Sequence, residues 1–241
     1  MQLWLCPLLA FLFGSIPFGW IFGKWKGIDI RQHGSGNIGA TNVWRVLGKS
    51  CGIPCFLLDV FKGVLPTLLG MTLIRFAGQT PGTSLSFLIP HAYIFPAEQQ
   101  VTAQTLVVFT GLLSILGHNY SPWVGFKGGK GIATSAGVLI ALMPAAMVLL
   151  LIVWALIFFV TRYVSLASII AAAVLPVLTH LGARFHHINN NPDLPTLWEA
   201  GTWNKPLFAF SVLIAGLAIW KHRSNIQRLR NGTENRFKKK S

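Results

Sequence analysis

The sequence predicts an all-α fold: a polytopic integral membrane bundle of seven transmembrane helices, with the N-terminus outside and the C-terminus in the cytoplasm. The first observation is composition, since the 241 residues are 53% hydrophobic and 11% charged, whereas a soluble domain carries about 25% charged residues. The second is that long apolar runs divide the chain. The third is that most Lys and Arg residues lie between or after these runs, as in cytoplasmic segments of membrane proteins.

Four apolar segments have about the 20 residues that a helix needs to cross a bilayer core of about 30 Å. The first is expected to be retained, because Lys24 and Lys26 follow it, whereas a signal peptide carries its positive charge in front. A fifth segment, Gln104–Gly117, is shorter and is expected to be tilted or only partly spanning. The four are Leu3–Gly23, Gly52–Phe76, Val164–Leu181 and Pro206–Trp220.

The apolar run from Ile132 to Val160 is expected to form two spans. As one helix its 29 residues would extend about 43 Å, too long for a bilayer without strong tilt. Pro144 lacks a backbone donor and disfavours helix at the residue before it, so we expect a tight hairpin at Met143 and Pro144.

The distribution of charge supports the count of seven. With two spans in that run, the cytoplasmic segments hold sixteen of the twenty Lys and Arg, and the eight in the tail lie inside. The segments around Gln79–Gln104 and Gly182–Lys205 then lie outside as connectors, the former with room for a short re-entrant segment. We expect one membrane-embedded domain over residues 1–241.

The net charge of +14 comes largely from these same Lys and Arg residues of the expected cytoplasmic segments. In a soluble protein this charge would indicate nucleic acid, but here topology explains most of it, so we expect no nucleic-acid partner. Anionic substrates and membrane lipid headgroups are the partners that the remaining charge suits.

Neither a metal site nor a cofactor is expected. Three cysteines, Cys6, Cys51 and Cys55, contain no CxxC pair and no histidines at metal spacing. A CDP-alcohol type of lipid transferase would need several Asp residues to hold divalent metals. The six acidic residues are instead scattered, at Asp29, Asp59, Glu98, Asp193, Glu199 and Glu234.

The first polar block is HGSGNIGATNVWRVLGK, residues 33–49. Its glycines allow positive φ and let backbone N–H groups point at an anion, and Arg45 adds a planar fork suited to phosphate oxygens. Thr41 or Asn42 is placed to cap a helix. The spacing does not match nucleotide-binding fingerprints, and a flexible interhelical loop is the alternative. The candidate ligands are Ser35, Gly36, Asn37, Thr41, Asn42 and Arg45.

The second block is GHNYSPWVGFKGGKGIAT, residues 117–134. Backbone donors, the Lys130 ammonium and a helix N-terminus converge in it, which is typical of an anion cradle. Lys127 and Lys130 as simple topology anchors are the alternative. For His118 a base, a phosphate partner and an interfacial histidine all stay open. The candidate phosphate ligands are His118, Gly128, Gly129, Lys130 and Gly131.

The third block begins at Lys221 and its motif ends near Glu234. His222, Asn225 and Arg228 recur at i, i+3 and i+6, so they lie roughly along one helical face. A basic tail is ordinarily a topology signal or a patch for anionic lipid. That interpretation suits Lys238–Lys240 but explains His222, Asn225 and Glu234 poorly.

Two further pairs of polar residues lie within an apolar segment or next to one. Asp59 and Lys62, at i and i+3, are an ion-pair candidate within the second span, where unpaired charge is costly. Arg162 and Ser165 lie at an expected cytoplasmic turn and are placed to face the same site. Roles for Asp59, Lys62 and Arg162 stay open.

The three blocks together resemble the acyl-phosphate-dependent glycerol-3-phosphate acyltransferases of bacterial membranes. The segments GSGNIGATNVWR, GHNYSPWVGFKGGKGIAT and HRSNIQRLRNGTE each look like one of the three cytoplasmic motifs of that family. The resemblance implies transfer of an acyl group from acyl phosphate to the 1-hydroxyl of glycerol 3-phosphate at the cytoplasmic membrane, giving lysophosphatidate and phosphate. It also implies a catalytic set made of Ser35, Arg45, His222, Asn225 and Glu234.

The chemistry of the blocks agrees with that reaction. Both substrates are anionic phosphates, so clustered cations and backbone donors are needed to bring them together. Acyl phosphate is already activated, and we expect direct attack by the glycerol hydroxyl, with the proton passing to His118, His222 or a substrate phosphate oxygen. A membrane transporter of a phosphorylated solute is the alternative function, since phosphate-cradling loops near spans serve both.

Overall fold

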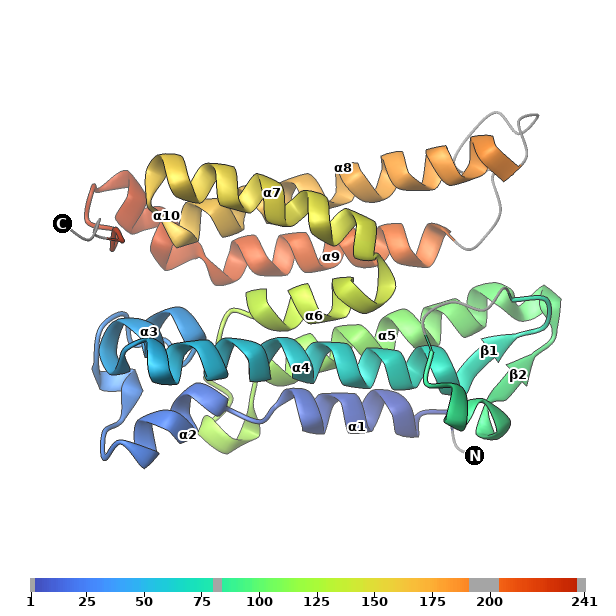
Figure 1. The fold of residues 1–241 in the computed structure, drawn as a ribbon, viewed down its shortest axis with the longest axis horizontal. Coiled ribbons are helices and arrows are strands. Elements are labelled where there is room, and N and C mark those ends of the chain that lie inside the picture. Colours follow the sequence, from blue (N-terminus) through green and yellow to red (C-terminus); the bar gives the residue numbers. More distant parts are fainter. Residues whose placement is uncertain (1–2, 80–83, 191–203, 238–241) are drawn as a thin grey trace. The chain divides into compact units, whose positions relative to one another are not determined.

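A computed structural model describes residues 3–79, 84–190 and 204–237, with the backbone alone described at residues 182–190 and 204. The described residues are mostly helical (Figure 1), which confirms the broad class of fold predicted from the sequence. They form two compact units, Met1–Leu142 and Met143–Ser241. The single domain predicted for residues 1–241 stays a prediction.

The first unit is built on six α-helices within its described residues. Short 3-10 turns η1 (Ile30–Gln32), η2 (Ser86–His91), η3 (Ala97–Gln99) and η4 (Pro122–Val124) lie between them. The helices are α1 (Leu5–Gly14), α2 (Phe18–Trp25), α3 (Ala40–Leu47), α4 (Lys49–Leu73), α5 (Gln100–Asn119) and α6 (Ile132–Leu142).

The second unit contains four helices in its described part: α7 (Pro144–Thr161), α8 (Val164–Asn190), α9 (Asn204–Lys221) and α10 (Arg223–Arg230). The α8 backbone continues past Leu181, where the sequence predicted the span to end. Residues 191–203 of the predicted outer connector and Lys238–Lys240 of the basic tail lie outside the described residues.

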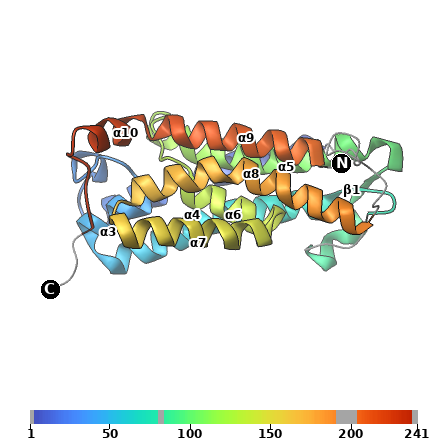
Figure 2. The same cartoon turned by 90° about the horizontal axis from the view of Figure 1, so that it is seen from above.

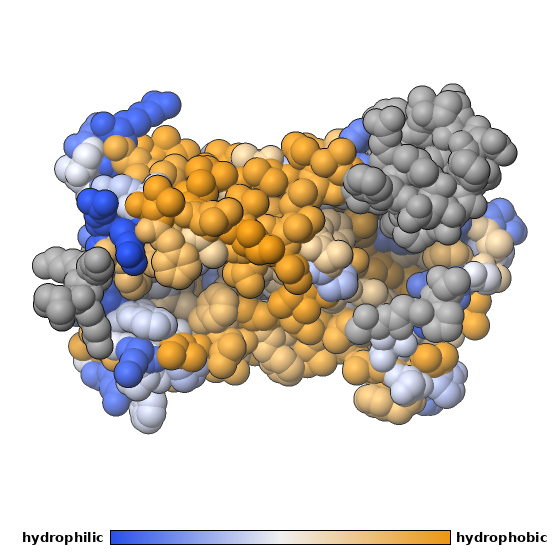
Figure 3. Space-filling model, turned by 45° about the horizontal axis from the view of Figure 1, so that its top comes forward, coloured by the Kyte–Doolittle hydropathy of each residue, from blue (hydrophilic) through white to orange (hydrophobic). Residues whose placement is uncertain are grey.

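Five helical segments among the described residues are long and apolar enough to cross a membrane. Hydrophobic residues cover much of the face drawn in Figure 3. On α7, Leu156 and Phe159 are 62% and 64% exposed, as lipid-facing residues are. The five segments are Leu5–Trp25, Lys49–Leu73, Ala97–Val124, Pro144–Thr161 and Val164–Leu181, and Ile132–Leu142 is a shorter apolar helix.

The expected break at Pro144 is confirmed. Helix α6 ends at Leu142 and α7 begins with Pro144 in its first turn, while Met143 has φ −147° and ψ 63°, outside the helical region. The missing N–H of proline costs nothing at a helix start, which explains the position of the break.

The first predicted span, Leu3–Gly23, is interrupted in the structure. Helix α1 ends at Gly14 and α2 begins at Phe18, because Pro17 cannot donate to a helix and disfavours helix at Ile16. The break leaves backbone carbonyl groups of Ser15 and Ile16 for other partners, and both are used in the site described below.

Glycines bring α4 and α6 into close contact, and the two helices lie side by side in both views (Figures 1 and 2). A Cβ on Gly63 of α4 would collide with the Thr134 carbonyl of α6, and one on Gly137 would collide with the Val60 carbonyl of α4. This reciprocal contact places the start of α6, and the loop before it, against the middle of α4.

After the C-terminal end of α4 the chain forms two short strands that the prediction of an all-α fold did not include. Strands β1 (Ile74–Phe76) and β2 (Tyr93–Phe95) pair in parallel, with Ile74 opposite Tyr93 and Phe76 opposite Phe95. β-branched and aromatic residues favour this pairing, and Ile74 and Phe95 are buried against Leu106 of α5. Helix α5 also begins at Gln100 rather than Gln104, so it is longer than predicted.

Candidate active site

Asn42 organises the loop of the first polar block. Its side chain is 2% exposed. The Oδ1 atom accepts a hydrogen bond from the Ser35 backbone N–H at 2.8 Å. The Nδ2 atom donates to the carbonyl groups of Asn37 at 2.9 Å and His33 at 3.0 Å. One buried amide therefore holds both sides of the turn that presents Ser35, while its predicted role as a phosphate ligand stays a prediction.

The helix that follows the turn starts two residues or more before the expected position. Gly39 is the N-cap of α3, and the Asn37 Oδ1 accepts from the Gly39 backbone N–H at 2.7 Å. Thr41 and Asn42 lie inside α3, so the prediction that one of them caps the helix is wrong. Gly34 and Gly36 have φ of +62° and +70°, which explains the glycines of the turn.

Ser35 and Arg45 reach the surface of this block. Ser35 is half-buried in the turn, and Arg45 lies exposed in the last turn of α3. Buried Ile38 and Val43 anchor the block beneath them in a hydrophobic cluster that also holds Val124 of the second block. The structure thus places the first two blocks against one shared cluster within the first unit.

Asn42→Ala is expected to lower the melting temperature of the protein by several degrees. The change leaves the Ser35 N–H without its acceptor and removes one donor from the carbonyl groups of Asn37 and His33, where an unsatisfied buried group costs about 1–3 kcal/mol. The measurement is thermal unfolding in detergent. Asn231→Ala, at an exposed position after α10, is the matched control, and an equal effect of both changes would contradict this role of Asn42.

The second block is tied to the break between α1 and α2. The Ser121 hydroxyl donates to the Ser15 carbonyl at 2.6 Å, and the Trp123 indole N–H donates to the Ser15 hydroxyl at 2.9 Å. The break that the sequence prediction missed is therefore an anchor for the chain that leaves α5.

The glycine loop, Gly128–Gly131, lies on the end of α5. The Gly129 backbone N–H donates to the His118 carbonyl at 3.1 Å, and a Cβ on Gly129 would collide with Nε2 of the His118 ring. Gly131 has φ of +80° and leads directly into α6 at Ile132. Lys130, partly exposed, lies between these two glycines just before a helix N-terminus, an arrangement that suits an anion.

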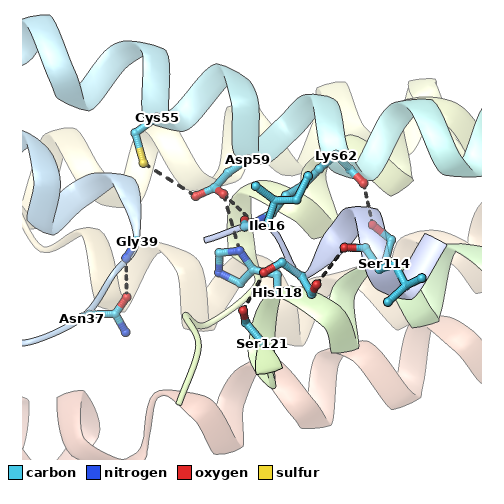
Figure 4. A network of polar contacts seen from close by, with 11 residues as sticks. Ile16, Asn37, Gly39, Cys55, Asp59, Lys62, Ser114, His118 and Ser121 are labelled. Carbon is cyan, nitrogen blue, oxygen red and sulfur yellow. Dashed lines mark hydrogen bonds and ion pairs between the residues drawn. The ribbon is translucent and has the colours of Figure 1, made fainter. Parts of the chain in front are cut away.

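Beneath the loop lies a buried ionic cluster, drawn in Figure 4. The Lys62 Nζ is 2.8 Å from the Asp59 Oδ1, which confirms the ion pair predicted from the sequence. His118 joins them, with its Nδ1 at 3.5 Å from the same oxygen. Sequence reasoning missed this third member, because it comes from α5 and only the packing of α5 against α4 brings it near.

In the second unit, Glu234 collects three donors from two elements. Its Oε1 accepts from Asn225 Nδ2 at 2.7 Å and from Ser165 Oγ at 2.8 Å, and its Oε2 accepts from Arg228 Nε at 2.8 Å. The carboxylate side chain is only 6% exposed. The structure therefore brings Ser165 together with the third block.

The segment after α10 also folds back on the turn between α7 and α8. The Phe237 backbone N–H donates to the Arg162 carbonyl at 3.0 Å. Arg162 has φ of +65°, in the left-handed region, at the end of α7. His222 is 3% exposed, and its Nδ1 lies 2.8 Å from the Ala218 carbonyl. Hydrogen bonds at Glu234 and Phe237 thus hold the segment after α10 against the start of α8 and the turn before it.

Within the described ranges, no three His, Cys, Asp or Glu side chains gather as metal ligands. The sequence-predicted residues instead fall into three groups. Ser35, Asn37 and Asn42 meet in the first block, and His118 meets Gly129 in the second. In the third, Asn225 and Glu234 meet through their side chains.

The chain resembles known proteins over nearly its whole length. Residues 4–232 match the family model described as glycerol-3-phosphate acyltransferase. A glycerol-3-phosphate acyltransferase from Desulforamulus reducens is 40% identical over 226 residues, which cover 93% of this chain and 90% of that protein. One from Fusobacterium nucleatum is 37% identical and covers 96% of each.

Solved structures give the same result. The crystal structure of PlsY, an integral membrane glycerol 3-phosphate acyltransferase, in its glycerol 3-phosphate form is 34% identical to this chain, with a TM-score of 0.72. The match covers 99% of this chain and 96% of that one. The lysophosphatidic acid form of the same enzyme matches with a TM-score of 0.70.

Proposed function

Because the chain belongs to the glycerol-3-phosphate acyltransferase family, we propose that it acylates the 1-hydroxyl of sn-glycerol 3-phosphate with acyl phosphate as donor. The products are lysophosphatidate and inorganic phosphate, and the reaction opens phospholipid synthesis. The relatives support the acceptor and the acyl transfer, since two solved forms of a similar enzyme are named for glycerol 3-phosphate and lysophosphatidic acid. Acyl phosphate is proposed as the donor because the three motifs resemble those of the acyl-phosphate-dependent family.

The proposal includes seven spans in a bacterial cytoplasmic membrane, with the N-terminus outside, the C-terminus inside and the active site on the cytoplasmic face. Five segments long and apolar enough to cross a membrane, together with α6 and α9, match that number. Sixteen of the twenty Lys and Arg then lie on the cytoplasmic side, together with all three motif blocks, which supports this orientation.

The glycine loop is the observation that carries the proposal. The Lys130 ammonium and the start of α6, whose first backbone N–H groups lack helical acceptors, meet above a buried ionic cluster. Such a loop holds a phosphate without supplying a nucleophile. We therefore assign the phosphate of glycerol 3-phosphate to Gly128–Gly131, with Lys130 as its cation, and we keep Gly36, Asn37, Thr41, Asn42 and His118 as the remaining phosphate-site candidates.

The catalytic set proposed is Ser35, Arg45, His222, Asn225 and Glu234. In this scheme the glycerol oxygen attacks the acyl carbonyl carbon, the bond from that carbon to the phosphate oxygen breaks, and phosphate leaves with the electron pair. The hydroxyl proton passes to His118, to His222 or to a substrate phosphate oxygen. Arg45 and the ordered third block stabilise the developing negative charge.

The test is turnover by the purified protein with radiolabelled glycerol 3-phosphate. We expect radiolabelled lysophosphatidate with acyl phosphate as donor and none with acyl-CoA. Arg45→Ala is expected to lower kcat/KM by about 100-fold, the effect of removing one charge-stabilising group. Product formed with acyl-CoA and not with acyl phosphate would overturn the proposal that acyl phosphate is the donor. Uptake of intact glycerol 3-phosphate into proteoliposomes, without any acyl transfer, would establish the transporter instead.

A further inference from the structure

Asp59 and Lys62 have no place in the reaction scheme above, yet with His118 they form a cluster that is as buried as His222 and Asn225 of the proposed catalytic set. The three side chains are 3%, 1% and 4% exposed. Charged groups inside a membrane protein are costly, and those that persist are paired with one another or serve function. Pairing reduces the cost of burying the charges of Asp59 and Lys62, but it does not by itself give these residues a role.

Lys62 connects the cluster to the break between α1 and α2. Its Nζ donates to the Ile16 carbonyl at 2.7 Å (Figure 4). Its own carbonyl accepts from the Ser114 hydroxyl of α5 at 2.6 Å. One residue therefore joins α4 to the break and to α5, the two elements from which the second block is anchored through Ser121 and His118.

His118 connects the cluster to the glycine loop. Asp59 faces the Nδ1 side of its ring at 3.5 Å. On the Nε2 side the ring is in contact with Gly129, where no Cβ would fit, and the His118 carbonyl accepts the Gly129 N–H. The ring is thus held between a carboxylate and the loop backbone, so any reorientation of the ring must move the loop.

We propose that Asp59 is a positioning residue: it orients the His118 ring and thereby sets the course of Gly128–Gly131 for the phosphate of glycerol 3-phosphate. Lys62 balances the charge of Asp59 and fixes the cluster to the broken helix. This inference rests on the proposed function for the identity of the ligand. The inference that Asp59 positions the glycine loop does not depend on the proposed function.

The test compares Asp59→Asn with the double variant Asp59→Asn/Lys62→Met. The single change leaves a buried ammonium without its carboxylate, which is strongly destabilising, whereas removal of both charges is often neutral. Thermal stability is therefore expected to fall in the single variant and to recover in the double variant. Asp29→Asn, which removes the carboxylate paired with the exposed Arg31 at 2.6 Å, is the matched control.

Kinetics separate positioning from a merely structural role. In both variants of Asp59, KM for glycerol 3-phosphate is expected to rise about tenfold while kcat changes by less than about threefold and KM for acyl phosphate is unchanged. A purely structural pair predicts that the double variant recovers its KM along with its stability. That result would overturn the proposal.

Amide hydrogen exchange provides a readout that needs no substrate. We expect faster exchange in residues 125–131 in both Asp59 variants, because the Gly129 N–H loses its fixed acceptor geometry, with wild-type exchange in Asp29→Asn. Unchanged exchange in this segment would also overturn the proposal. If the wild-type protein fails to turn over glycerol 3-phosphate, the proposed function fails, and the exchange experiment still decides the role of Asp59.

Discussion

Glu234→Gln is expected to reduce kcat/KM by about 100-fold or more, the largest effect expected of a substitution outside the first two blocks. The carboxylate accepts from Ser165 and Asn225 on one oxygen and from Arg228 on the other. An amide offers one acceptor and one donor group. In either orientation it turns an N–H₂ toward a donor, so at least one charge-assisted or buried hydrogen bond is replaced by repulsion.

The loss is expected to act through the order of the third block. Asn225 and Arg228 are held by Glu234, and the segment after α10 is held to α8 through Ser165. We therefore expect trypsin to cleave faster after Arg228 and Arg230 in the variant. Glu98→Gln, an identical change at an exposed carboxylate of η3, is expected to leave both measurements unchanged. Wild-type activity in Glu234→Gln would contradict the assigned role.

The same carboxylate predicts a pH dependence. Burial tends to raise the pKa of Glu234, but the hydrogen bonds from Asn225, Ser165 and Arg228 outweigh it and hold that pKa below the ordinary value of 4.5. A group whose pKa is lowered on folding contributes stability above its unfolded pKa and loses it as the pH falls through the folded one. Tail protection is therefore expected to be complete above pH 4.5 and to decline below it, and Glu234→Gln should abolish this dependence.

The breaks in the helices show what sequence reasoning could predict. The break at Pro144 was predicted correctly because an apolar run of 29 residues exceeds a bilayer, so length required an interruption and proline gave its place. The break before Pro17 was missed because Leu3–Gly23 fits a bilayer as a single helix, and length therefore gave no reason to divide it. The short strands after α4 were missed for a related reason, since three-residue runs are too short for a pattern.

Within the candidate site, contacts between residues close in the sequence could be predicted, whereas contacts between residues far apart in the sequence could not. The pair of Asp59 and Lys62 was predictable, because i and i+3 spacing places both on one helical face. Asp59 also meets His118, 59 positions away in the sequence, and no periodicity relates such residues. Ser165 and Glu234 are 69 positions apart, and only their shared expected location at a cytoplasmic turn and tail indicated a common site.

The second large effect concerns the glycine loop, where Gly129→Ala is expected to lower kcat/KM for glycerol 3-phosphate by about 100-fold. The added Cβ would collide with the His118 Nε2. Asp59 lies 3.5 Å from the other ring nitrogen, Nδ1, and restricts movement of the buried ring away from the loop. The backbone of α5 is equally constrained, since Gly117 packs directly against the Phe11 carbonyl of α1. The loop must therefore move, and with it the backbone donors that hold phosphate.

Two comparisons isolate this steric cause. Gly216→Ala, in α9, adds the same methyl group where nothing beyond the neighbouring backbone of the helix itself lies within 4 Å, and it is expected to leave activity and stability unchanged or slightly raised. Gly129→Ala/His118→Ala removes the ring that the methyl group meets, so its melting temperature is expected to return most of the way from the single variant to wild type. If the double variant is no more stable than Gly129→Ala, the collision with His118 is not the cause, and the loop owes its course to other contacts of the second block.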